Sequence, residues 1–285
     1  METISDFLDF LRERTIMVPN GVWIVLQQFF ITRLREQRFP SRAELDSVAP
    51  DLPVWFRTGP DGSANSLALK ENGIDKEFAT RHPQHVSVDP STGEPTGVIR
   101  QSSAVLKTRS NKSRKKRSDK QLDDRLVDLL KDYNRWGITG IIDRNCSDVS
   151  RAQYARLLEA DRLTTRVRLS RSLNATISLP EINERLDTIA ADPYFKNPNP
   201  RLGVLGVKVF EDGGMLTGSA FFSRPWGTST IYGIVDPRYR GMQFIDEDRL
   251  EQLVRACAAR GLAFTAHCQG DAAVDTLVGV YKRVN

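Results

Sequence analysis

The sequence predicts an α/β protein whose second half contains a parallel sheet. Three observations support this class. Helical and strand periodicities alternate regularly from Gln121 onward. The intervening helices are long enough to serve as right-handed crossover connections between parallel strands. The chain has 285 residues, of which 40% are hydrophobic and 27% charged, so it can bury the core of one large domain or two smaller ones.

The first hundred residues predict irregular α+β structure. Residues 5–14 form a short amphipathic stretch, and residues 22–30 form an apolar run. Ser41 and Glu44 have the spacing of a capping box, so a short helix should begin there. Further along, 53–57 is a strand candidate, and 89–97 is expected to be loop because it is dense in proline and glycine.

The second half predicts helices and strands in strict alternation. Leu122, Leu126 and Leu130 recur at helical spacing, and Gly137 supplies the positive φ that ends this helix. Pro180 suits the first turn of a later helix. The four predicted strands are 138–142, 165–169, 204–210 and 262–267, and the later helices are 149–160, 180–191, 246–260 and 272–283.

The net charge of +5 is concentrated in one segment. Residues 107–120 contain eight lysines and arginines and one acid, a net charge of +7, which leaves −2 for the remainder of the chain. This polar composition cannot bury enough apolar surface to offset its ordering entropy, so we expect a basic mobile loop. A nuclear address or a polyanion-docking site at 112–117 is the alternative interpretation. Nucleic acid is not an expected partner, because such domains spread basic residues over a face and interleave aromatic residues.

The sequence favours a soluble protein of the cytoplasm. Its longest apolar stretches are far shorter than the roughly 20 residues that a bilayer crossing needs, so no membrane partner is expected. The acidic N-terminus does not match an export signal. Cys146, Cys257 and Cys268 are too few and too scattered for a disulfide framework or a structural zinc site.

Polar side chains at the ends of predicted strands are the candidates for chemistry. Asp143 follows one strand, Lys208 interrupts the apolar run 204–210, and His267 ends another strand before a glycine turn. Burying an ammonium group costs several kcal/mol unless the group is paired or chemically changed. Lys208 is therefore either paired with Asp143 or Asp212, or it is a neutral or modified lysine at a functional site.

Two other motifs carry less weight. His82 and His85 have the spacing of metal ligands, but they lie in a polar stretch flanked by proline and are interpreted as surface histidines. Residues 213–219 are rich in glycine, yet they lack the form of a phosphate-binding loop, and no dinucleotide-binding fingerprint is present.

Several stretches together resemble amidohydrolase family 3, the group that includes enzymes of the N-substituted formamide deformylase type. The longest and most specific match runs from Val207 to Ala220. The resemblance extends over nearly the whole chain. The matching stretches are 38–46, 57–61, 65–69, 93–97, 132–134, 206–220, 232–234 and 265–271.

The resemblance implies a metal-dependent hydrolase built on a (β/α)8 TIM barrel, of which this chain would hold about strands 2–5. Lys208 would be the fourth-strand lysine, often carboxylated, and His267 the fifth-strand histidine; both would bind a divalent metal, which we expect to be zinc. The metal would activate water to attack an amide or formamide C–N bond in a small-molecule substrate. The residues expected to line the substrate pocket are Asp212, Asp143, Asn65 and Asp271. The expected divisions are a lid subdomain at 1–106, the basic loop at 107–120 and a partial barrel at 121–285.

The chain departs from the family pattern in its ligands. It has no His-x-His pair, because its three histidines are His82, His85 and His267. A sixth-strand histidine and an eighth-strand aspartate are also missing, so we interpret the chain as an internal fragment. The catalytic base is then expected outside this chain, and the fragment should bind metal weakly or not at all and lack activity.

Two further interpretations remain from the sequence. The chain could be a non-catalytic binding or scaffold protein that retains the fold and uses the basic loop as its interaction element. Half a barrel also leaves unpaired strand edges, which makes a second copy of the chain a candidate partner.

Overall fold

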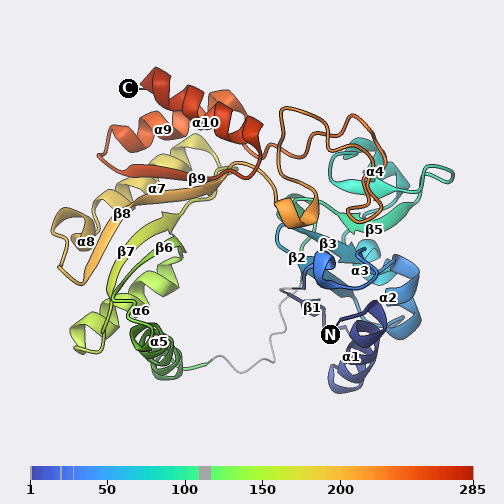
Figure 1. Ribbon diagram of the computed structural model, residues 1–285, viewed down its shortest axis with the longest axis horizontal. Coiled ribbons are helices and arrows are strands. Elements are labelled where there is room, and N and C mark those ends of the chain that lie inside the picture. Colours follow the sequence, from blue (N-terminus) through green and yellow to red (C-terminus); the bar gives the residue numbers. More distant parts are fainter. Residues whose placement is uncertain (1, 20, 28, 109–116, 285) are drawn as a thin grey trace. The chain divides into compact units, whose positions relative to one another are not determined.

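The computed structural model describes residues 2–19, 21–27, 29–108 and 117–284. The chain divides into two compact units that interleave along the sequence (Figure 1). The first unit comprises Met1–Arg114, Asp212–Phe244 and Cys268–Val274; the second comprises Lys115–Glu211, Ile245–His267 and Asp275–Asn285. This division differs from the contiguous one expected from the sequence, because two segments of the second half belong to the first unit.

The first unit contains a five-stranded mixed sheet in the order β1-β2-β3-β5-β4. β1 and β2 are parallel, and the other pairs are antiparallel. The strand candidate at 53–57 corresponds to β2. The prediction of a loop at 89–97 is wrong at its end, because β5 begins at Pro95. Proline is tolerated as the first residue of a strand. The strands are β1 (Ile24–Leu26), β2 (Val54–Thr58), β3 (Asp61–Ala64), β4 (Val86–Val88) and β5 (Pro95–Ile99).

Short capped helices surround this sheet. The expected capping box is present at the second helix, where the Ser41 hydroxyl accepts from the Glu44 N–H and the Glu44 carboxylate accepts from the Ser41 N–H. Thr3 and Asp6 form the same motif at the first helix. The helices are α1 (Ile4–Met17), α2 (Arg42–Val48), α3 (Ser66–Glu71) and α4 (Lys76–Arg81), with 3₁₀ turns at Ile31–Arg33, Ser102–Ala104 and Met215–Thr217.

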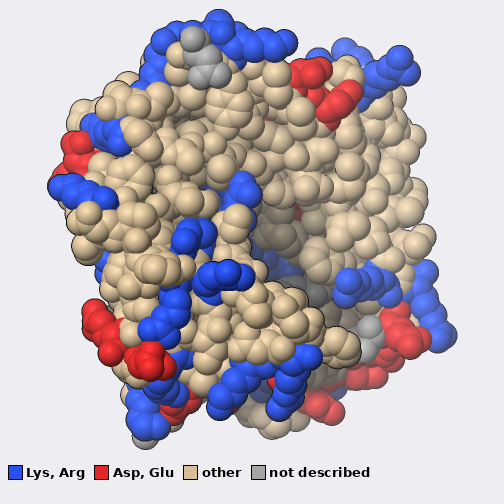
Figure 2. Space-filling view, turned by 60° about the vertical axis from the view of Figure 1, so that its left-hand side comes forward, with Lys and Arg blue, Asp and Glu red and all other residues tan. Residues whose placement is uncertain are grey.

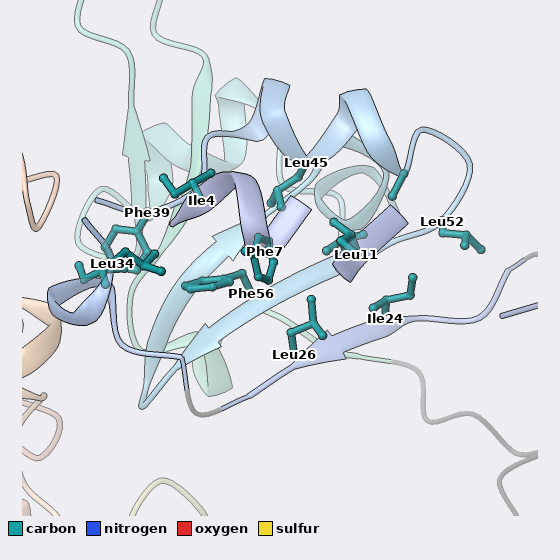
Figure 3. Close-up of a cluster of buried hydrophobic side chains, with 13 residues drawn as sticks. Ile4, Phe7, Leu11, Ile24, Leu26, Leu34, Phe39, Leu45, Leu52 and Phe56 are labelled. Carbon is teal, nitrogen blue, oxygen red and sulfur yellow. The ribbon is translucent and has the colours of Figure 1, made fainter. Parts of the chain in front are cut away.

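Aromatic side chains form the centre of one core of the first unit. Phe7 of α1 packs edge-on against Phe56 of β2, with ring centroids 4.9 Å apart, and Figure 3 shows the two side chains next to each other. Leu11 of α1 and Leu45 of α2 are fully buried in the same cluster. The amphipathic stretch at the N-terminus therefore forms a helix because its apolar side covers the sheet.

The second unit contains a four-stranded parallel sheet in the order β6-β7-β8-β9, visible as successive arrows in Figure 1. The predicted strands and their parallel arrangement are confirmed. Among the described residues β6 and β9 are edge strands, so the sheet does not by itself form a closed barrel. The elements are α5 (Asp119–Arg135), β6 (Gly140–Cys146), α6 (Asp148–Glu159), β7 (Arg166–Ser172), α7 (Leu179–Ala190), α8 (Pro193–Lys196), β8 (Leu202–Phe210), α9 (Glu247–Ala258), β9 (Ala263–His267) and α10 (Asp271–Val284), whose first turn belongs to the first unit.

The two faces of this parallel sheet differ in burial. One face carries Val167, Leu169 and Val209, all fully buried. The opposite face carries Ile142, which is 51% exposed, and Phe210, which is 45% exposed. The apolar run at 204–210 is therefore buried on one face only within the second unit.

Most of the predicted basic loop falls outside the described residues, which exclude 109–116. At its end, Ser118 caps α5, so Asp119 and Lys120 are helical. Figure 2 shows lysine and arginine side chains in separate groups on the face drawn, where acidic groups also occur. No helix among the described residues combines the length and the apolar character needed to cross a membrane.

Candidate functional site

Lys208 and His267 lie on the same face of the parallel sheet of the second unit. In the register of β8 and β9, Lys208 lies opposite Thr265 and Phe210 lies opposite His267. Side chains two residues apart in a strand point to the same face, so these four side chains share one face of the sheet. The ring centroids of Phe210 and His267 are 5.3 Å apart, and the Lys208 Nζ lies 4.3 Å from the centroid of the Phe210 ring. Phe210 thus contacts both residues of the predicted metal pair.

The surroundings of Lys208 suit an ammonium group. The side chain is buried, with 8% of the residue exposed, and its Nζ donates a hydrogen bond of 3.0 Å to the Val209 carbonyl. The face of the Phe210 ring adds a cation–π contact, an interaction worth about 0.5–2 kcal/mol. Both contacts favour the charged amine over a carboxylated side chain, whose negative group would be repelled by a carbonyl oxygen and by the ring face.

The structure does not bring Asp143 to this face. Asp143 pairs with Leu169, which pairs with Val204 on the buried side of the sheet. Its carboxylate lies beside the Cys146 thiol, whose pKa rises to about 12, first because of burial and then because of the Asp143 charge. Asp143 also contributes, after burial, to a raised pKa of the Tyr154 hydroxyl.

Asp212 of the first unit has a structural role, because its carboxylate binds the backbone of two loops. The residue is 1% exposed, and it accepts from the backbone N–H of Phe221 at 3.0 Å, of Gln269 at 2.9 Å and of Gly270 at 2.8 Å. A Cβ on Gly270 would lie 1.7 Å from the Phe221 carbonyl oxygen, so only glycine allows this approach. Asp212 therefore ties together two loops that follow strands far apart in sequence.

Asn65 is also occupied by the fold. It is fully buried; its side-chain oxygen accepts from the N–H groups of Val54 and Ala68, and its amide donates to the carbonyls of Ala49 and Leu52. These four bonds use its hydrogen-bonding capacity and cap α3. Asn65 therefore has a structural role in the first unit.

Asp271, in contrast, lines a cavity of about 580 Å³ in the first unit. Its carboxylate accepts from the backbone N–H and the hydroxyl of Ser223, and these bonds hold its pKa below the ordinary value. Phe222, Arg224 and Trp226 line the same cavity. Asp271, unlike Asp212 and Asn65, thus lies beside an open space.

A buried polar cluster of the first unit was not foreseen from the sequence. The Asp61 carboxylate accepts from the Ser219 hydroxyl at 2.6 Å and from the Gln101 N–H at 2.9 Å, and it lies 3.8 Å from the Arg100 guanidinium. Arg100 donates to the carbonyl of Thr217 at 2.9 Å and to that of Tyr232. The sequence did contain one signal for this cluster, because Asp61 and Ser219 lie within two of the stretches that carry the family resemblance.

The residues present do not form a complete metal site. Within the described ranges, no three or more His, Cys, Asp or Glu side chains are grouped so that they could hold an ion. Catalytic zinc generally takes three protein ligands and an open position, whereas His267 supplies one and Lys208, as an ammonium, supplies none. His82 and His85 do not add a third, since their ring centroids are 6.4 Å apart and the His85 Nδ1 lies 3.2 Å from the Arg100 carbonyl oxygen.

Solved structures share this fold. An uncharacterized metal-dependent hydrolase from Pyrococcus horikoshii aligns with 99% of this chain and 51% of its own, with a TM-score of 0.53 and 19% sequence identity. A second one from Pyrococcus furiosus aligns with 100% of this chain and 53% of its own, with a TM-score of 0.51 and 18% identity. At these identities the comparison establishes similarity of fold.

Sequence comparisons identify the family. The chain is 25% identical to N-substituted formamide deformylase of Arthrobacter pascens, over 100% of this chain and 51% of that protein. It is 24% identical to the putative amidohydrolase YtcJ of Bacillus subtilis, over 98% and 50%, respectively. The chain thus spans about half the length of the curated relatives it matches. The family model described as amidohydrolase family matches residues 2–285, and the chain therefore belongs to the amidohydrolase family.

Proposed function

We propose that this chain is part of a metal-dependent hydrolase that acts on a non-peptide C–N bond, of the amide or formamide type. The observation that supports this best is the placement of Lys208 and His267 on one face of adjacent parallel strands, near their carboxyl ends, in a chain of the amidohydrolase family. Reactive groups of α/β barrels gather at those strand ends. The name of the Arthrobacter pascens relative supports the formamide class.

The described residues do not fit a metal site on their own, so no catalytic step follows from them. His267 offers one nitrogen ligand, while Lys208 has the contacts of a cation. We therefore expect weak zinc binding, no amide turnover by this chain alone, and a catalytic base supplied from outside it.

Zinc content after dialysis tests the ligand role of His267. We expect weakly held zinc that His267→Ala removes and that the matched control His82→Ala leaves unchanged. Equal zinc content in both variants would refute the proposed site. Tightly held stoichiometric zinc would instead contradict the expectation of an incomplete ligand set.

Formate release from an N-alkylformamide tests the reaction. The chain alone and the chain extended by its flanking coding sequence are compared, each with and without Lys208→Ala. We expect release by the extended protein alone, and its loss in the variant. No release by either would favour a non-catalytic binding or scaffold protein, the second candidate, for which the incomplete ligand set within the described residues is the supporting observation.

A further inference from the structure

We propose that a second cavity of the first unit binds a small organic carboxylate that carries an apolar group. The cavity has a volume of about 570 Å³, within the range of roughly 300–1,000 Å³ typical of ligand sites. α4 and β4 line one part of it, and the loop at 233–242 lines another. None of the six residues expected at the hydrolase site lines this cavity, so the proposal is independent of the proposed function.

The cavity offers an apolar wall. Ala79 of α4 and Val86 of β4 are buried and contribute to it, as do Ile234 and Met242 of the loop. Burial of an apolar ligand group against this wall would contribute about 25 cal/mol per Å² removed from water.

Tyr239 supplies a directional hydrogen-bond donor. Its hydroxyl is buried, and among the described residues it has no hydrogen-bond partner. Burial raises the pKa of Tyr239 to about 12, so the hydroxyl keeps its proton at neutral pH. A buried donor without an acceptor costs about 1–3 kcal/mol, and a ligand oxygen that reaches the hydroxyl through a small shift of the Tyr239 side chain would remove that cost.

The charges that line the cavity favour an anion. Lys76, Arg100 and Asp236 are its charged lining residues, which gives a net charge of +1. The Arg100 guanidinium lies 5.5 Å from the centroid of the Tyr239 ring, and its charge is partly offset by Asp61 at 3.8 Å. The Lys76 amine donates a hydrogen bond of 2.7 Å to the Thr92 carbonyl oxygen. This oxygen belongs to a neutral group, so it does not offset the positive charge of Lys76. A monocarboxylate balances this excess and provides the acceptor that Tyr239 lacks.

Benzoate and its neutral isostere benzamide are the probes, with binding measured by calorimetry on the whole chain. We expect saturable binding of benzoate and at least about tenfold weaker binding of benzamide, the factor that corresponds to a single hydrogen bond to a charged group. Tyr239→Phe should weaken benzoate binding about tenfold, and Lys76→Ala should weaken it less. The matched control Tyr194→Phe should leave it unchanged, because Tyr194 lies in α8 of the second unit.

Three results would overturn the proposal. They are absence of saturable benzoate binding, equal affinities for benzoate and benzamide, and unchanged affinity in Tyr239→Phe. We do not expect Tyr239→Phe to lose benzoate affinity through misfolding, because it removes only a hydroxyl without a hydrogen-bond partner among the described residues. None of these measurements depends on hydrolase activity, so failure here and failure of the proposed function are distinguishable.

Discussion

Replacement of Asp212 tests whether this residue belongs to the fold or to a substrate pocket. Its carboxylate accepts three backbone N–H bonds, two at Oδ2 and one at Oδ1. Asp212→Asn can keep the two bonds at one oxygen but turns an amide group toward the third N–H, so we expect a loss of about 2 kcal/mol of unfolding free energy. Asp212→Ala leaves all three N–H groups without their acceptor, and we expect about 4 kcal/mol.

Urea unfolding followed by tryptophan fluorescence provides the measurement. Three of the four tryptophans, Trp23, Trp55 and Trp226, lie in the first unit, so the signal reports mainly on the unit that contains Asp212. Asp51→Asn is the matched control, since Asp51 is exposed in the first unit and such surface changes stay within about 0.5 kcal/mol. If Asp212→Asn also stays within that range, the structural role is refuted and a role in a pocket becomes the better interpretation.

The remaining predictions concern stability. Asn65→Ala removes four buried hydrogen bonds and should cost about 3 kcal/mol in the same urea assay; a cost below about 1 kcal/mol would contradict the role assigned to Asn65. Ser118→Ala removes the cap of α5 and should cost about 1 kcal/mol, whereas Ser103→Ala, at an exposed position, is the control and should cost less. The Arg38 guanidinium lowers the pKa of Glu44 from 4.5 to about 2, so this pair stabilises the fold above about pH 4.5 and its contribution is lost as the pH falls toward 2. Stability measured across that window should fall less steeply for Glu44→Gln than for the wild type; parallel curves would show that the pair does not contribute.

The second unit was predictable because local and long-range signals agree there. Gly137 has the positive φ that ends α5, and Pro180 lies in the first turn of α7, where its missing N–H costs nothing. Ser178 and Glu181 complete a capping box at the same helix. Of the strands between such helices, β8 is largely a continuous apolar run, as in buried parallel sheets, whereas β7 alternates polar residues with Val167 and Leu169.

Apart from β2, the strands of the first unit were not predicted, and β3 shows why local signals fail there. β3 consists of Asp61, Gly62, Ser63 and Ala64, a sequence typical of a turn, yet all four residues are buried. Gly62 is required there, because a Cβ would lie 2.1 Å from the Phe56 carbonyl oxygen and would meet the Trp55 ring. Tertiary contact with the neighbouring strand therefore outweighs the local preference of Asp-Gly for a turn.

The placement of Lys208 depends on one irregularity that sequence periodicity cannot reveal. Leu169 pairs with Val204, but the next residue of β7 pairs with Gly206, so Leu205 is an extra residue in β8. Without it, Lys208 would lie on the same face as Asp143; with it, Lys208 lies on the opposite face. The β8–β9 register keeps His267 on the face of Lys208 in either case. Gly206 permits the close approach of β9 at this point, since a Cβ would lie 1.9 Å from the Ala263 carbonyl oxygen. The separation of Lys208 from Asp143 is thus made by a bulge, a feature of strand pairing rather than of the residues that carry the chemistry.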